Sequence, residues 1–230
     1  MLHAEEGGSA IGGAVNMYDL KTQGHLGDEI MFESRLLEYD KAFCELGLSP
    51  LSNTRIFDAG CANGKWLDIV CKRWGANERN CAGNDVRDYI WNEWIAAHPN
   101  SKIDFVRQPT HELTLPRGSF GVVHQSMMLS SIIDTGIRHR TCEVLWDLIS
   151  PGGFLISYDF WINPFNSRTH AIRMRDLQQL FPEAKLAYKR FITLAPPICR
   201  PLSRFGGSFV RELEKLRALN SHLLVALQRV

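Results

Sequence analysis

The sequence predicts an α/β fold in which helices cover both faces of a mostly parallel sheet. Short apolar segments with strand character alternate with helical segments along most of the chain, which is typical of such a sheet. One strand runs directly into a glycine turn and a helix at residues 55–66. With 230 residues, of which 45% are hydrophobic and 22% charged, the chain has the composition of a compact globular domain with a sizeable core.

The chain begins with a segment that has too little apolar content to form a core element. We expect the glycine-rich residues 1–27 to be a flexible N-terminal segment, and residues 28–230 to form a single domain. Tyr18 lies in this segment, which we expect to close over a bound ligand. From Asp28 to Leu46, apolar residues recur at roughly helical spacing and predict a helix before the first strand.

The elements that follow alternate in type. Strands are predicted near residues 54–59, 80–85, 102–107, 119–125, 154–160, 185–194 and 221–230. Helices are predicted near residues 63–74, 138–149, 174–181 and 202–219, and another opens after the second strand. Residues 194–202 are expected to be an apolar loop, which either lines a ligand pocket or packs on the core. The last helix either covers its own sheet or lies on a membrane surface.

The turn after the first strand has the residue types of a ligand-binding device. It reads Asp58-Ala59-Gly60-Cys61-Ala62-Asn63-Gly64, so the glycines allow a tight turn close to a ligand, and the helix that follows offers unpaired N–H groups. A dinucleotide-binding turn has the pattern G-x-G-x-x-G and holds a pyrophosphate. Here the carboxylate of Asp58 would repel a pyrophosphate and attract an ammonium group. We therefore expect a ligand with an amino acid moiety.

A second acid follows at the end of the second strand, in the segment Cys81-Ala82-Gly83-Asn84-Asp85-Val86. The interval from Gly64 to Asp85 is close to the roughly 20 residues that separate a glycine turn from its ribose-binding acid. Asp85 is therefore suited to accept both ribose hydroxyls, and this role is compatible with capping the next helix.

Together with two later segments, these residues resemble the motifs of class I S-adenosylmethionine-dependent methyltransferases. The first turn is similar to the D/E-x-G-x-G-x-G motif of that family, with Ala62 in place of the middle glycine. Residues 115–123, LPRGSFGVV, resemble its "LP..GSFD.V" segment, with Gly121 in place of the aspartate. Residues 148–155, LISPGGFL, resemble its "L.PGG.L" hinge. The resemblance covers residues 54–160 by motif and the rest of the chain by layout.

The resemblance implies a Rossmann-like methyltransferase fold, which is a doubly wound, seven-stranded, mostly parallel sheet. Its last strand is antiparallel and lies between its two predecessors. The implied cofactor is S-adenosylmethionine. The residues placed around this cofactor are Asp58, Gly60, Cys61, Asn63, Gly64, Asp85, Val86, Gln108, Thr110, His111 and Gln125.

The catalytic candidates are His124 and Asp159, which lie at the ends of predicted strands. Methyl transfer mainly requires alignment of the acceptor with the activated methyl group, and a hydroxyl acceptor also profits from a general base. His124 can equally be a core histidine, because alternate residues of a strand point to opposite faces. We expect transfer to a small-molecule or glycan acceptor, with oxygen as the acceptor atom. The alternatives are a tRNA or protein methyltransferase and a non-catalytic S-adenosylmethionine-binding module.

Composition and charge narrow the other expectations. The six cysteines form no C-x-x-C pair and no cluster with zinc spacing, so we expect free thiols and no metal site. A net charge of +1, with basic residues spread along the chain, gives no footprint for nucleic acid. No segment approaches the roughly 18 apolar residues that span a membrane, and no signal peptide is visible. We therefore expect a cytoplasmic protein without stable membrane insertion.

Overall fold

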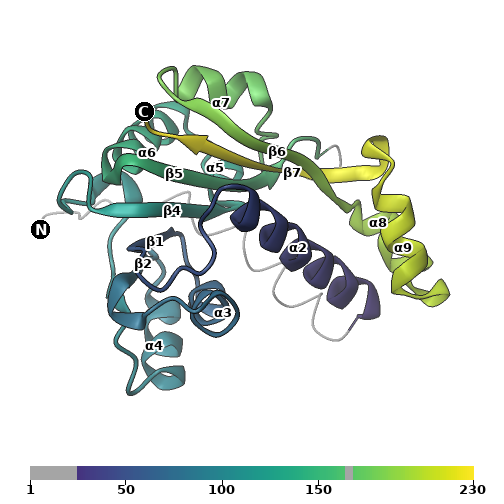
Figure 1. Cartoon of the computed structure of the whole chain (residues 1–230), viewed down its shortest axis with the longest axis horizontal. Helices are drawn as coiled ribbons and strands as arrows, with labels where there is room; N and C mark the ends of the chain where they lie inside the picture. The colour runs from purple at the N-terminus through teal and green to yellow at the C-terminus, as the bar shows by residue number, and fades with distance from the viewer. Residues whose placement is uncertain (1–24, 164–167) are drawn as a thin grey trace, which may run out of the picture.

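The computed structural model describes residues 25–163 and 168–230 and contains a seven-stranded sheet with helices on both faces (Figure 1). The strands lie side by side in the order β3-β2-β1-β4-β5-β7-β6. Neighbours are parallel except that β7 runs antiparallel to β5 and β6, between which it lies. The predicted sheet is therefore confirmed. Residues 1–24 of the predicted N-terminal segment, Tyr18 among them, lie outside the described residues.

The strands have the positions that the sequence predicts, with different ends. They are β1 (Ile56–Ala59), β2 (Cys81–Asn84), β3 (Asp104–Val106), β4 (Phe120–Ser126), β5 (Ile149–Phe160), β6 (Lys185–Leu194) and β7 (Asn220–Gln228). β5 begins well before residue 154 because the Pro-Gly-Gly segment belongs to it. Phe120 pairs with Ile149 and Val122 with Phe154, so the residues between the two pairs bulge out of the ladder.

The longer helices are α2 (Leu26–Glu45), α3 (Lys65–Trp74), α4 (Asp88–Ala97), α6 (Thr135–Leu148) and α9 (Gly207–Glu214). Shorter ones are α5 (Met128–Ser131), α7 (Met174–Leu180) and α8 (Pro196–Leu202). Turns of 3-10 helix are η1 (Glu78–Asn80), η2 (Thr110–Glu112), η3 (Ser203–Phe205) and η4 (Arg217–Leu219). Caps set some of the ends: the His25 ring accepts a hydrogen bond from Gly27 N, and the Asp134 carboxylate accepts one from Ile137 N.

The prediction of one continuous helix over residues 202–219 is wrong, and so is the prediction of a loop before it. Gly206 has a φ of 93° and separates η3 from α9. Pro196 starts α8, where the missing N–H of a proline costs no helical hydrogen bond. Cys199 of α8 donates to Gly27 O, and Arg200 pairs with Asp28, so this segment packs on α2.

The sheet separates two hydrophobic cores, and successive residues of β5 enter opposite ones. Ile156 packs with Phe43 of α2 and Val70 of α3, whereas Leu155 packs with Leu129 and Leu145, which come from α5 and α6. This alternation follows from the two-residue period of a strand. Helices α2 and α3 thus cover one face, and α5, α6 and α7 cover the other (Figure 1).

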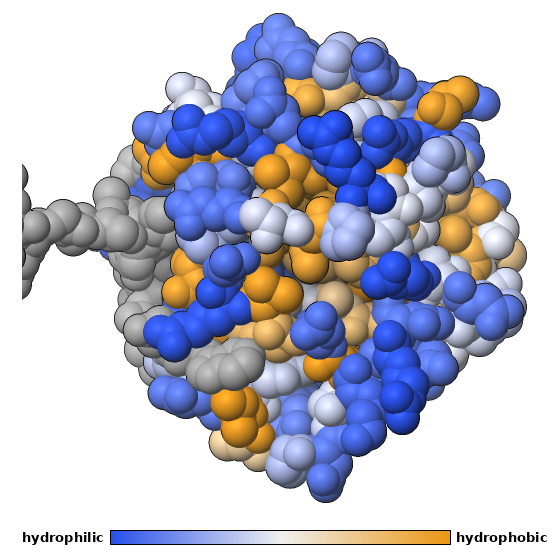
Figure 2. Space-filling view, turned by 90° about the vertical axis from the view of Figure 1, so that its left-hand side faces the viewer, coloured by the Kyte–Doolittle hydropathy of each residue, from blue (hydrophilic) through white to orange (hydrophobic). Residues whose placement is uncertain are grey.

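The surface, the helices and the cysteines add four observations. Figure 2 shows the end of the molecule at which β7 finishes, where hydrophobic side chains gather near the centre among hydrophilic ones. In the described part of the chain, no helix is long and apolar enough to cross a membrane, and no group of His, Cys, Asp or Glu residues is arranged to hold a metal ion. All six cysteines are free, as predicted.

Packing at the centre of the sheet can be tested with two leucines in strands. Leu155 is fully buried, whereas Leu186 of β6 is 43% exposed. Leu155→Ala should lower the free energy of unfolding by about 2–5 kcal/mol, because it leaves a cavity in the core. Leu186→Ala is the matched control and should have a much smaller effect. Denaturant unfolding of both variants measures the difference, and equal losses would contradict the packing described above.

Candidate active site

The glycine turn joins β1 to α3 at the carboxyl end of the sheet. Gly60 and Gly64 have φ values of 67° and 75°, in the left-handed region that favours glycine. A side chain at Gly60 would come within 3.1 Å of Met128, which follows β4, and one at Gly64 would collide with the ring of Trp94. Gly64 is therefore required for the packing of α4 against the turn, in addition to the backbone conformation.

A buried chain of hydrogen bonds begins on α2 and ends at the Asp58 carboxylate. Asp58 of β1 and His124 of β4 are register partners, and the Nδ1 and Oδ1 atoms of the two side chains are 2.7 Å apart. The other ring nitrogen of His124 lies 2.8 Å from the hydroxyl of Tyr39. When Asp58 is ionised, a neutral His124 donates from Nδ1 to the carboxylate, so its Nε2 accepts from Tyr39. We call this the Tyr39–His124–Asp58 chain.

Burial favours the neutral forms of both ionisable partners in this chain. Burial raises the pKa of Asp58, and the neighbouring His124 opposes that effect. Burial lowers the pKa of His124, and Asp58 opposes it. Trp66 of α3 stacks on the imidazole with ring centroids 3.6 Å apart and an interplanar angle of 4°. His124 is thus held on three sides by aromatic and polar groups.

Two buried polar atoms beside this chain have no hydrogen-bond partner among the described residues. They are Nε of Arg35, on α2, and Nε1 of Trp66. The guanidinium of Arg35 lies over the rings of Phe32 and Tyr158, at 5.1 and 4.9 Å from their centroids. A half-buried cation held by aromatic faces, with a buried Nε donor that is free, is suited to bind an anionic group.

Asp85 follows β2 and lies next to the glycine turn, but its carboxylate is fully engaged. Its Oδ2 accepts from Ala62 N at 3.1 Å and from Arg87 Nη2 at 2.9 Å. Its Oδ1 accepts from Arg87 N at 3.0 Å and from Arg87 Nε at 2.9 Å. A carboxylate has about four lone-pair sites, so Ala62 N and the three donors of Arg87 together occupy all of them.

The loop after β3 is tied to the end of β2 by Asn84, a residue that the sequence interpretation missed. The amide nitrogen of Asn84 donates to Gln108 O at 2.7 Å and to Thr110 Oγ1 at 3.1 Å. An asparagine in the last position of a short buried strand was the available signal. His111 lies beside Glu112, and Val86 is 38% exposed.

The remaining site residues predicted from the sequence do not lie together. Cys61 is buried beside Gly83, and Asn63 is exposed at the turn, where its side chain accepts a hydrogen bond from Lys65 N. Gln125 and Asp159 lie on the face of the sheet that α5 covers. Gln125 accepts from Met128 N and Leu129 N, and Asp159 accepts from Ser130 N at 3.1 Å, so both hold α5 in place.

His124 and Asp159, the two catalytic candidates, are thus on opposite faces of the sheet. Burial raises the pKa of Asp159 to about 6. Both side chains are buried, and both ring nitrogens of His124 are engaged within the Tyr39–His124–Asp58 chain. Their catalytic roles stay predictions. The sequence left open which face His124 occupies, and the structure places it on the face that α2 covers.

Comparisons with known proteins find no matching family model and no matching curated protein, but the fold matches many solved structures. An S-adenosylmethionine-dependent methyltransferase from Mesorhizobium loti has a TM-score of 0.60 and 17% identity, and the match covers 79% of this chain and 94% of that chain. The chain has the fold of S-adenosylmethionine-dependent methyltransferases.

Two further structures show how varied the proteins with this methyltransferase fold are. Geranyl diphosphate C-methyltransferase from Streptomyces coelicolor A3(2) has a TM-score of 0.62 and 13% identity, with 84% of this chain and 76% of that chain covered. The cyclase SpnF has a TM-score of 0.59 and 13% identity, with 83% and 78% covered. The methyltransferase fold therefore occurs together with more than one named activity.

The hydroxyl of Tyr39 can be removed without changing the shape of the ring. Tyr39→Phe should leave Nε2 of the buried His124 without a partner and lower the free energy of unfolding by about 1–3 kcal/mol. Tyr89→Phe is the control, because Tyr89 is exposed. Thermal or denaturant unfolding measures both variants. An unchanged stability of Tyr39→Phe would contradict the hydrogen bond assigned to this hydroxyl.

Acid stability should depend on His222 of β7, which stacks on Tyr158 with ring centroids 4.7 Å apart. Burial lowers its pKa from 6.5 to about 3. Between these values the unfolded chain binds a proton that the folded chain does not. The contribution of His222 to the free energy of unfolding should therefore fall as the pH falls through this window, by up to about 1.4 kcal/mol per pH unit, whereas the raised pKa of Asp159 acts in the opposite direction.

The variant His222→Phe keeps an aromatic ring at this position and should reduce the slope of stability against pH between pH 6.5 and about 3. His139→Phe, at an exposed position of α6, is the control and should keep the original slope. Denaturant unfolding at several pH values measures the slopes. Identical slopes for the original chain and His222→Phe would show that His222 does not carry this dependence.

Proposed function

We propose that the chain is an S-adenosylmethionine-dependent methyltransferase that acts on a small-molecule or glycan acceptor, with oxygen as the acceptor atom. The observation that carries this proposal is the direct link between the glycine turn and the acid after β2. Ala62 N, inside the turn, donates to Asp85 Oδ2, so the two parts of a nucleoside site lie within one hydrogen bond of each other. The fold of the solved methyltransferases supports the same reading.

The polar groups present fit this cofactor once the side chain of Arg87 moves. Asp85 provides the carboxylate for the ribose hydroxyls, after Arg87 has left it. Gly60 gives the backbone a left-handed turn at the end of β1. For the amino acid moiety, the ammonium group would favour the ionised form of Asp58, whose pKa burial raises, and Arg35 would offer a cation with a free Nε to the carboxylate. Val86, Gln108, Thr110 and His111 would surround the adenine.

The cofactor would supply a methyl group already activated on a sulfonium. The task of the protein is then to hold the donor and acceptor in line and to exclude water. The Tyr39–His124–Asp58 chain would fix the orientation of the Asp58 carboxylate, because His124 is hydrogen-bonded at both nitrogens. A hydroxyl acceptor also needs somewhere to release its proton, and His124 and Asp159 stay the candidates for this general base.

The choice of acceptor rests on the comparison structures and on charge. Geranyl diphosphate C-methyltransferase is named for a small-molecule acceptor. The net charge of +1 gives no general attraction for nucleic acid, which argues against the tRNA alternative. We also propose that the protein acts in the cytoplasm.

A non-catalytic S-adenosylmethionine-binding module is the second candidate, and two observations favour it. Arg87 occupies the ribose positions of Asp85, and both candidate bases are buried with their polar atoms engaged. Both proposed functions require the chain to bind the cofactor. Calorimetric titration with S-adenosylmethionine and S-adenosylhomocysteine tests this binding. Transfer of a labelled methyl group to a panel of small hydroxyl compounds then separates them, since only the enzyme would label an acceptor. A folded chain that binds neither ligand would contradict both proposals.

Two substitutions at the ribose position should change affinity in opposite directions. Asp85→Asn should weaken the binding of S-adenosylhomocysteine by about 1.5–3 kcal/mol, because it removes a charged hydrogen-bond acceptor. Arg87→Met removes the competing guanidinium. If that guanidinium leaves Asp85 in about a tenth of the molecules, Arg87→Met should tighten binding about tenfold.

Calorimetry measures both variants, with Asp104→Asn and Arg79→Met as exposed controls that should bind as the original chain does. Weaker binding by Arg87→Met would show that Arg87 contacts the ligand instead of competing with it. Unchanged binding by Asp85→Asn would reduce Asp85 to a structural role.

A further inference from the structure

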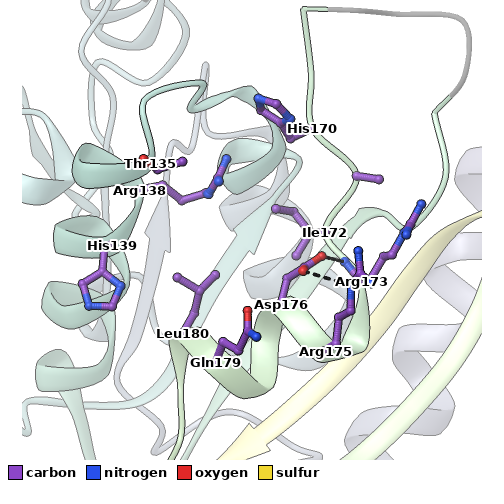
Figure 3. Close-up of a pocket in the computed structure, with 11 residues that line it drawn as sticks. Thr135, Arg138, His139, His170, Ile172, Arg173, Arg175, Asp176, Gln179 and Leu180 are labelled. Atoms are coloured by element: carbon purple, nitrogen blue, oxygen red, sulfur yellow. Dashed lines mark hydrogen bonds and ion pairs between the residues drawn. The ribbon is translucent and has the colours of Figure 1, made fainter.

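A groove with a volume of about 550 Å³ lies between the start of α6 on one side and α7 with the segment before it on the other (Figure 3). It belongs to the face of the sheet that α5, α6 and α7 cover, whereas the Tyr39–His124–Asp58 chain lies on the opposite face. His170 N donates to Ser130 O at 2.8 Å, which ties the segment before α7 to the end of α5. The volume is that of a typical site for a small molecule.

The groove is rich in positive charge. Its lining contains three arginines and two histidines, but only one carboxylate, that of Asp176; the five basic residues are Arg138, His139, His170, Arg173 and Arg175. With neutral histidines, the lining has two positive charges in excess. A phosphate dianion would balance this excess, and guanidinium groups bind phosphate oxygens in pairs.

The basic groups are held by local structure. The Nη1 atom of Arg138 donates to Ile132 O at 2.9 Å, which anchors its guanidinium at the wall of the groove. Asp176 accepts from Arg173 N at 2.8 Å through Oδ2, and its Oδ1 is 3.5 Å from Arg175 Nε. The single carboxylate of the lining is thus drawn towards the start of its own helix, as Figure 3 shows.

Part of the lining is apolar. Ile172 is buried, and Leu180 and Ala171 are partly buried. In Figure 3, Leu180 and Ile172 lie between Arg138 on α6 and Arg173 before α7. A ligand that used the whole groove would therefore need an apolar part beside its anionic group.

We propose that this groove binds the phosphate group of a small organic phosphate with an apolar body. Arg173 and Arg175 bind the phosphate from the α7 side, Arg138 binds it from the α6 side, and Ile172 and Leu180 contact the apolar body. The proposal does not depend on methyl transfer, because the groove and the nucleoside site lie in different parts of the fold.

Calorimetric titration with phenyl phosphate, at constant ionic strength in chloride, tests this proposal on the whole chain. The expected result is saturable binding with one site per chain, and weaker binding of inorganic phosphate. Arg173→Gln and Arg175→Gln should each weaken the binding of phenyl phosphate about tenfold, since each removes a charged hydrogen bond. Both residues are exposed, so the variants should fold.

Arg140→Gln is the matched control, because Arg140 is an exposed arginine of α6 that does not line the groove. It should bind phenyl phosphate as the original chain does. An equal loss of phenyl phosphate affinity in all three variants would overturn the proposal, because it would indicate a non-specific electrostatic attraction to the surface. Absence of saturable binding would also overturn it. Equal affinity for inorganic and phenyl phosphate would overturn the proposal of an organic phosphate, because it would show that Ile172 and Leu180 add nothing to binding and that the groove binds free phosphate.

Discussion

The pairing of a buried carboxylate with a buried imidazole is the constraint on which the centre of this structure depends. Removing Asp58 from water is costly unless its oxygens are hydrogen-bonded, and the parallel register of β1 and β4 places His124 beside it. His124 needs a second partner, which is Tyr39 of α2, and a flat neighbour, which is Trp66 of α3. Two strands and two helices therefore meet at one polar cluster.

Much of the fold could be predicted from the sequence, because it depends on patterns within short segments. The apolar strands, the glycine turn and the interval to Asp85 are all local, and the structure has them where they were expected. The Tyr39–His124–Asp58 chain could not be predicted, because its hydrogen bonds join residues 85 and 66 positions apart. Such pairs are set by the register of strands and the placement of a helix.

The cofactor site shows where local patterns mislead. The sequence indicates correctly that Asp85 follows β2, but it does not show that Arg87, two residues later, turns back onto the same carboxylate. Gln125 and His124 are neighbours in sequence and face opposite cores. A shift of one residue along the strand therefore decides whether a side chain contacts α2 or α5. The broken helix after β6 depends on Gly206, whose positive φ is visible only in three dimensions.

The antiparallel strand β7 has a consequence for synthesis of the chain on the ribosome. β7 lies between β5 and β6 and provides hydrogen-bonding partners for both, yet it is made after both of them. Arg229, just after it, donates to three carbonyl groups near the end of α6. During translation β6 therefore emerges with no neighbour in the sheet. The edges of β5 and β6 that β7 joins stay unpaired until β7 has left the exit tunnel, and unpaired strand edges make a nascent chain prone to aggregation.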